Sequence, residues 1–174
     1  MVLSTSAPII IDKHELHSTW PVYAQPETRN LVQEGVTLTV NRTHTCYGPG
    51  DRISVNAAVH SDLAHTVTLR GFEFALRETM VFRAGGQASG KRSAPQVKVN
   101  IIAEQKVPVN AMLSGGAPPQ KAELAVTIPE RHTTTTLNAA RHIDITYVLQ
   151  VKALLSSGQP ITIDLPVIVS NWPK

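Results

Sequence analysis

Two segments near the carboxyl end place an apolar residue at every second position. Residues 143–155 read IDITYVLQVKALL, and residues 161–169 read ITIDLPVIV. A period of two belongs to a β-strand with one face buried and the other in contact with polar surroundings. The five residues between them, SSGQP, are turn formers, so the pair is predicted to be an antiparallel hairpin.

The same period recurs through the middle of the chain. It is visible in residues 36–41, 53–60, 97–101 and 124–128, and in a longer strand that starts near Val67. In that long strand the phase slips by one residue at Gly71, which predicts a β-bulge and a bend. Pro108 and residues 114–119 are interpreted as breaks, and 131–136 as a connection or an edge strand. With no helical periodicity, the pattern predicts an antiparallel β-sandwich of seven or eight strands, a count that is about what such folds contain.

A tight turn, Gly48-Pro49-Gly50-Asp51, precedes one of these strands. Proline fixes φ at the second turn position, and glycine supplies the positive φ that a type II turn needs at the third. The turn is therefore explained by geometry alone, and it is expected to direct Ile53 into the core. Residues 1–35 are interpreted as an approach segment, with a short edge strand at residues 9–11, and residues 36–174 as the sandwich.

Composition narrows the class of protein. Hydrophobic residues make up 42% of the 174 residues and charged residues 17%, which is typical of an ordinary globular chain. The net charge of +3 is too small for a nucleic-acid-binding face, so no nucleic-acid partner is expected. One cysteine, Cys46, excludes an intrachain disulfide and favours a reducing compartment. No signal peptide or membrane-spanning segment is recognisable, so a cytoplasmic location is predicted.

The sequence offers little for catalysis or for a cofactor. Residues 86–91, GQASGK, approach a phosphate-binding loop, but Arg92 stands where the magnesium-binding Ser or Thr belongs and Pro95 replaces a helix start. His14 and His17 lack zincin spacing. His44 and Cys46 could form a thiolate pair on one strand face, although a lone strand cysteine more often packs as a small hydrophobe. We expect no enzyme activity, catalytic residue, cofactor or metal.

The densest positive charge surrounds a loop rich in glycine and serine at residues 84–96. Its members are Arg83, Lys91, Arg92 and Lys98. They either solvate the tip of the loop or contact anionic lipid headgroups or an acidic partner.

The motifs in this order resemble the carboxy-terminal domain of arrestins. Residues 47–59, YGPGDRISVNAAV, are similar to that domain's "Y-x-P-G-[DE]-x-I-x-[VI]" opening. Residues 145–151, ITYVLQV, and 163–169, IDLPVIV, are similar to its closing strands. The resemblance covers about residues 36–170 and is specific in its combination. More loosely, residues 16–23 look like the interdomain connection of fungal arrestin-related proteins.

The resemblance implies an immunoglobulin-like sandwich, the second of two in an arrestin-related trafficking adaptor. Such adaptors link membrane receptors or transporters to ubiquitin ligases and endosomal machinery, at the plasma membrane or at endosomes. This sequence has no amino-terminal lobe and no Pro-Pro-x-Tyr motif, since Gln120 follows Pro119. Three alternatives stay open: a structural module whose main partner is the other lobe, a retromer-type arrestin relative or other sandwich, and an enzyme using Cys46.

Overall fold

The computed structural model describes residues 6–7, 21–83, 94–138 and 140–171. These residues form a 3-10 turn, Pro21–Tyr23, and nine strands. The strands are β1 (Glu27–Gln33), β2 (Val36–Arg42), β3 (Cys46–Tyr47), β4 (Arg52–Ser61), β5 (Val67–Phe82), β6 (Gln96–Leu113), β7 (Gln120–Thr127), β8 (Ile143–Leu155) and β9 (Ile161–Val169). They make two sheets, in the orders β1-β2-β4-β7 and β3-β9-β8-β5-β6. All neighbours are antiparallel except β3 and β9, so the predicted antiparallel sandwich is confirmed.

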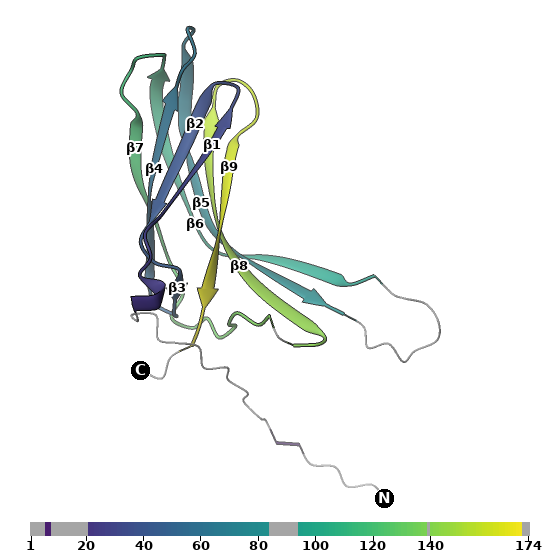
Figure 1. Cartoon of the computed structure of the whole chain (residues 1–174). Coiled ribbons are helices and arrows are strands. Elements are labelled where there is room, and N and C mark those ends of the chain that lie inside the picture. Colours follow the sequence, from purple (N-terminus) through teal and green to yellow (C-terminus); the bar gives the residue numbers. More distant parts are fainter. Residues whose placement is uncertain (1–5, 8–20, 84–93, 139, 172–174) are drawn as a thin grey trace, which may run out of the picture.

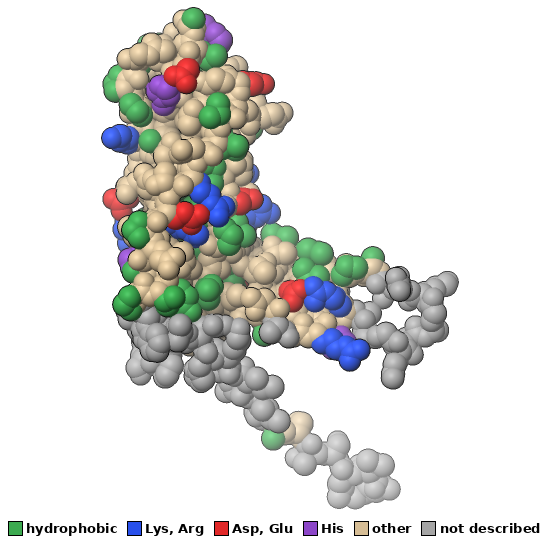
Figure 2. Space-filling view, in the orientation of Figure 1, with side chains coloured by type: hydrophobic (Ala, Val, Ile, Leu, Met, Phe, Trp, Pro, Cys, Tyr) green, Lys and Arg blue, Asp and Glu red, His purple; other side chains and the backbone are tan. Residues whose placement is uncertain are grey.

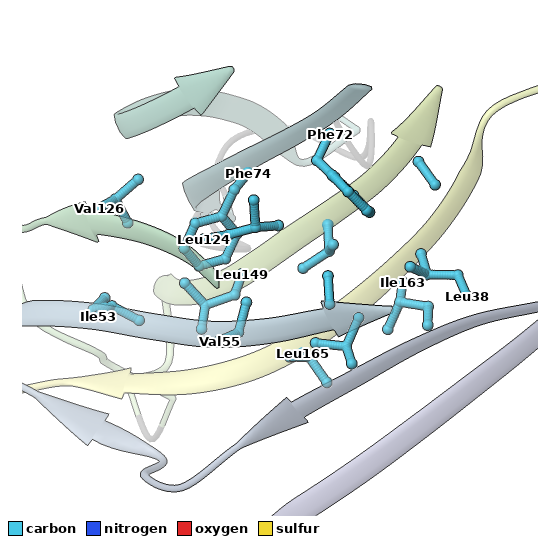
Figure 3. Close-up of a cluster of buried hydrophobic side chains, with 14 of the residues drawn as sticks. Leu38, Ile53, Val55, Phe72, Phe74, Leu124, Val126, Leu149, Ile163 and Leu165 are labelled. Carbon is cyan, nitrogen blue, oxygen red and sulfur yellow. The ribbon is translucent and has the colours of Figure 1, made fainter. Parts of the chain in front are cut away.

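The two sheets stack face to face and enclose one apolar core (Figures 1 and 3). Alternate residues of β2 and β4 point inward from the first sheet, and alternate residues of β5, β8 and β9 meet them from the second. Leu38, Ile53, Phe74 and Leu149 are each 0% exposed. The alternation found in the sequence therefore identified the buried face of each of these strands, because strand side chains alternate between the two faces of a sheet.

The sandwich includes residues upstream of the boundary expected at residue 36. Strand β1 pairs along its whole length with β2 and forms the edge of the first sheet. Its sequence, ETRNLVQ, is mostly polar and exposed, so it lacks the apolar alternation by which strands were recognised. The short strand expected at residues 9–11 lies outside the described residues.

The Gly-Pro-Gly turn has the predicted geometry, and Ile53 after it is buried in the core as expected. Gly50 has φ +85°, and the Asp51 amide donates to the Gly48 carbonyl at 3.1 Å, as in a type II turn. The turn carries the chain from β3 in the second sheet to β4 in the first, rather than joining two paired strands. The preceding Tyr47 is buried and donates its hydroxyl to the His44 carbonyl at 3.0 Å. Burial raises the pKa of Tyr47 to about 12, so its phenol stays neutral.

Two irregularities bend the long β5–β6 hairpin. One shift of register lies between Leu69 and Gly71, where the sequence predicted a bulge. A second, between Leu76 and Arg77, arises from the extra residue Ile102 on β6 and was not predicted. Pro108 does not end a strand, contrary to expectation: β6 continues from Gln96 to Leu113. Proline is tolerated because it sits next to a bulge on an edge strand, where fewer backbone amides need a partner.

Beyond the second irregularity, three strands leave the body of the sandwich. We call this projection the arm: residues 77–82 of β5, 96–101 of β6 and 143–148 of β8. In Figure 1 the arm extends sideways from the lower end of the body, with β6 along its upper edge. The described residues between β7 and β8, 128–138 and 140–142, run across the foot of the body toward the arm, and we call them the crossover segment.

Arginines close the open side of β9. Arg29 of β1 donates to the Asp164 carbonyl at 2.9 Å, and Arg42 of β2 donates to the Pro166 carbonyl. Arg42 is only 6% exposed, and its guanidinium also binds the Glu27 carboxylate. These side chains link the edges of the two sheets and occupy carbonyls that an additional strand would otherwise pair with.

Candidate protein-interaction surface

The arm part of β6 is an edge strand with exposed apolar side chains. Val97 is 57% exposed, Val99 46% and Ile101 58%. Among the described residues, β6 pairs with β5 alone, so its other side has no strand partner. An edge strand of this kind offers backbone donors and acceptors in register with an apolar row, which is the arrangement that an extended peptide recognises.

The three residues lie on one face of the arm, which we call the outer face. Val97 is opposite Val81, Val99 is opposite Thr79, and Ile101 is opposite Arg77. In β8, Arg77 is in turn opposite Val148. The outer face of the arm is therefore an apolar row beside the open edge of the sheet. Figure 2 shows hydrophobic side chains gathered along the upper side of the arm, where Figure 1 places β6.

The row ends at a charged depression where the arm joins the body. This depression has a volume of about 210 Å³ and is lined by Ile101 together with charged and amide side chains. They come from β5, β6 and β8, and include Glu73, Arg77, Glu104, Lys106, Gln150 and Lys152. Arg77 donates to Gln150 at 3.3 Å, and Lys106 lies 4.0 Å from Glu73. An apolar row with mixed charges at one end suits a protein partner, because interfaces combine an apolar centre with a polar rim.

The four basic residues predicted to contact lipid or a partner do not form one patch in the part that the structure describes. Arg83 forms an ion pair with Asp144, which is opposite Val81 and so lies on the outer face. Lys98 is exposed and opposite Met80, on the inner face. Lys91 and Arg92 lie outside the described residues. The lipid contact stays a prediction.

The remaining chemical candidates that fall within the described residues, Cys46 and His44, do not form a pair. Cys46 is 1% exposed, whereas His44 is exposed and contacts the Thr43 hydroxyl at 2.8 Å. The phosphate-loop-like residues 86–91 and the histidines at 14 and 17 lie outside the described residues. Among the residues that the structure describes, no group of three or more His, Cys, Asp or Glu side chains is placed to hold a metal ion. Within the described residues, no helix has the length and apolar character needed to span a membrane.

Sequence reasoning found the strand that carries the apolar row but not its exposure. Alternation at residues 97–101 predicted one buried face, whereas the apolar side chains of that row are exposed. A signal was present in the flanking sequence, because residues 84–95 are rich in glycine and serine. A strand next to a long sequence of this composition is a candidate for projection beyond the core.

The comparisons with known proteins agree with the fold. The family model for the arrestin (or S-antigen) C-terminal domain matches residues 33–174. The match spans most of the chain, and the chain therefore belongs to the arrestin C-terminal domain family. The match confirms the resemblance to arrestin C-terminal domains, and with it the immunoglobulin-like sandwich of arrestin type.

A solved structure shares the architecture at low sequence identity. The chain superposes on Spo0M, a sporulation control protein from Bacillus subtilis, with a TM-score of 0.62 and 12% identity. The match covers 79% of this chain and 50% of Spo0M, so the chain spans about half the length of that protein. At this identity the likeness shows the fold alone. A search of curated proteins finds no match.

Proposed function

We propose that this domain is a non-enzymatic adaptor module that binds the cytoplasmic tails of membrane receptors or transporters. Through regions outside this chain, it connects them to ubiquitin ligases or endosomal machinery. Membership of the arrestin C-terminal domain family supports the adaptor class. The observation that carries the proposal is the apolar row of Val97, Val99 and Ile101 on an edge strand. An extended tail segment pairs with β6 and packs its alternate apolar residues on that row.

The test is a pull-down from lysate of the source cell, read by mass spectrometry, with two baits. One is the wild-type domain, and the other carries Val97→Thr, Val99→Thr and Ile101→Thr. Threonine keeps the β-branched shape that strands favour, so the arm stays folded while its apolar surface is lost. Met112→Thr is the matched control, because Met112 is 75% exposed at the opposite end of the same strand.

We expect the wild type and the Met112 control to recover receptor or transporter tails with ubiquitin or endosomal proteins. The triple variant should lose them. Equal recovery by the triple variant would remove the arm from the proposal. Recovery of chaperones alone by all baits would contradict an adaptor role for this lobe by itself.

A second function is favoured by the coverage of the structural match, since this chain spans only half of Spo0M. In this version the domain is a structural lobe, and the apolar row of the arm docks on a companion domain. An orphaned interface of this kind causes self-association of the isolated domain. Size-exclusion chromatography with light scattering should then show concentration-dependent dimers for the wild type and a monomer for the triple variant. A monomeric wild type at all concentrations contradicts this version.

Contact with anionic membranes is a further part of the proposal, and Arg83, Lys91, Arg92 and Lys98 carry it. Asp144 already neutralises Arg83, whereas Lys98 is exposed on the other face. Lys91→Glu with Arg92→Glu is expected to reduce sedimentation with phosphatidylserine vesicles, and Lys98→Glu to reduce it more than Arg83→Glu. Unchanged sedimentation of the double variant would exclude the membrane contact. The proposed location is cytoplasmic, peripheral to the plasma membrane or endosomes.

A further inference from the structure

The inner face of the arm contains a cluster of buried polar side chains. Glu78 of β5 is 2% exposed, and Tyr147 of β8 is 1% exposed. His132 of the crossover segment lies over them, with an 11% exposed side chain. Asn100 of β6 completes the cluster by donating its amide to Glu78 Oε1 at 2.9 Å. Burying a carboxyl group this deeply is costly unless its hydrogen-bond partners suit its protonation state.

Three polar atoms surround the Tyr147 hydroxyl oxygen. Glu78 Oε2 lies at 2.5 Å, the Thr134 carbonyl oxygen at 2.7 Å, and His132 Nε2 at 2.8 Å. The phenol remains protonated, because burial raises the pKa of Tyr147. The hydroxyl therefore has one hydrogen to donate and accepts through its lone pairs.

Counting hydrogens decides which protonation state satisfies all three contacts. A backbone carbonyl can only accept, so the tyrosine hydrogen must point to Thr134. The other two contacts are then hydrogen bonds only if Glu78 Oε2 and His132 Nε2 each carry a hydrogen. With an ionised Glu78, the carboxylate and the Thr134 carbonyl would compete for a single hydrogen, and one short oxygen–oxygen contact would have none.

Among the described residues, no lysine or arginine forms an ion pair with Glu78. The titratable groups that face it are Tyr147 from β8 and His132 from the crossover segment, whose Nε2 is 3.7 Å from Glu78 Oε2. From β6 it faces the neutral amide of Asn100. Lys98 also lies on the inner face, two residues before Asn100 on β6, but it is exposed. Arg77 and Arg83 belong to the outer face.

We propose that Glu78 is a neutral carboxylic acid in the folded protein and that the cluster is a proton-dependent latch, which holds the crossover segment against the arm. Glu78 donates to Tyr147, Tyr147 donates to the Thr134 carbonyl, and His132 donates to Tyr147. Loss of the Glu78 proton turns the Tyr147 hydrogen toward the carboxylate and releases the Thr134 carbonyl. The neighbouring backbone hydrogen bonds of the crossover segment are then weakened. They run from the Thr136 amide to the Val169 carbonyl at 2.8 Å and from the Leu137 amide to the Ile145 carbonyl at 2.9 Å.

The latch predicts how stability depends on pH. If Glu78 holds its proton in the folded chain and ionises in the unfolded chain, the folded state binds more protons. Stability then falls as pH rises, because unfolding releases a proton. For one such proton, the unfolding equilibrium constant increases up to tenfold per pH unit above about 4.3, the ordinary pKa of an exposed glutamate.

Glu78→Gln is the decisive variant because an amide reproduces the proposed hydrogen-bond pattern. Its oxygen accepts from Asn100 and its nitrogen donates to Tyr147, at every pH. The measurement is urea unfolding of wild type and variant across acidic to mildly alkaline pH. Glu104→Gln, on an exposed glutamate of neighbouring β6, is the matched control and should follow the wild type. We expect the wild type to lose stability relative to Glu78→Gln as pH rises. Parallel profiles would overturn the proposal.

Two measurements complete the test and do not depend on the stability of the variant. In wild-type protein labelled with carboxyl-13C glutamate, the Glu78 carbon should show the chemical shift of a protonated acid at neutral pH. The shift of a carboxylate there would contradict the protonated state. Hydrogen-exchange protection of the Thr136 and Leu137 amides should fall on raising pH in the wild type and stay constant in Glu78→Gln. Equal behaviour of the two proteins would exclude the latch even if the acid is neutral.

Discussion

Strands β5, β6 and β8 run through both the body and the arm, but the apolar residues of β6 change face between the two: Val107 lies opposite the buried Phe72, whereas Val97 lies opposite Val81 on the outer face. In the body, β5 and β8 bury Phe74 and Leu149 against the first sheet, while Glu73 and Lys152 point outward. In the arm, the inner face of these strands holds Glu78 and the outer face of β6 holds an exposed row of valine and isoleucine. Alternation shows which residues share a face, but which face is covered depends on what packs against it.

The reason for the difference is the reach of the first sheet. Strands β1, β2, β4 and β7 cover only the body part of the second sheet. Near Glu78 the inner face of the arm packs instead against the crossover segment, whose Thr134 carbonyl and His132 ring both contact the Tyr147 hydroxyl. Polar side chains at this place give the backbone carbonyl a partner that an apolar face would lack.

The largest effect should come from the body. Phe74→Ala removes a fully buried ring between the sheets. We expect a loss of about 3–5 kcal/mol in the free energy of unfolding, from lost burial and a residual cavity. Denaturant unfolding by fluorescence and circular dichroism checks this. A loss no greater than that of an arm variant would contradict the division into a packed body and a projecting arm.

The second-largest effect should come from the edge of the body where Arg42 links the two sheets. Arg42→Met removes the donors to Glu27 and to the Pro166 carbonyl but keeps a long apolar stem. We expect a loss of about 1–3 kcal/mol, since hydrogen bonds to charged groups are lost at a nearly buried site. The Lys substitution, Arg42→Lys, is the matched control that keeps the charge, and it should lose less.

The same ion pair has a pH signature opposite to that of the latch. The hydrogen bond from Arg42 holds the pKa of Glu27 below its usual range. Its stabilisation is therefore present above the ordinary glutamate pKa and is lost as pH falls through the lowered value. Acid titration of stability should show this loss in the wild type and a smaller one in Arg42→Met. An equal acid loss in both proteins would show that Glu27 is not the group involved.

The first irregularity of the β5–β6 hairpin depends on the close approach of two backbones at Gly71. A Cβ added there would lie 2.6 Å from the Val107 carbonyl oxygen, which is backbone and cannot rotate away. Gly71→Ala is expected to cost about 1–3 kcal/mol, as in other overpacked sites. The control is Ala75→Gly, which tests the strand propensity of alanine and glycine on β5. Gly116→Ala is less suitable because Gly116 has a positive φ. Thermal unfolding of Gly71→Ala and Ala75→Gly measures the two changes in stability.

The smallest effect is expected on the arm itself. Val99→Thr replaces an exposed side chain with one of nearly equal shape. Stability should change by no more than about 0.5 kcal/mol, as for most surface substitutions. A loss well above this, in chemical denaturation, would mean that the outer face is covered in the isolated domain and is not available to a partner.

Much of the fold follows from the sequence. The period of two in β2, β4, β8 and β9 identified the strands and their inward residues, and Gly71 indicated the bulge. Strand β1 was not predicted because its position at the edge of the sheet leaves it polar. The break predicted at Pro108 was wrong because proline is tolerated next to a bulge on an edge strand. The exposed row on β6 has the same sequence pattern as a buried one, so its role in binding could not be predicted from alternation.

The sequence alone determined the β-sandwich, the family resemblance and the turn that directs Ile53 into the core, because each depends on local periodicity or backbone geometry. Only the tertiary structure decided that the strands continue past the first sheet, that Glu78 meets Tyr147 and His132, and that Val97, Val99 and Ile101 face solvent. These features join residues from β5, β6, β8 and the crossover segment, which lie far apart along the chain. Their energies depend on which groups burial brings together, and no local pattern records that.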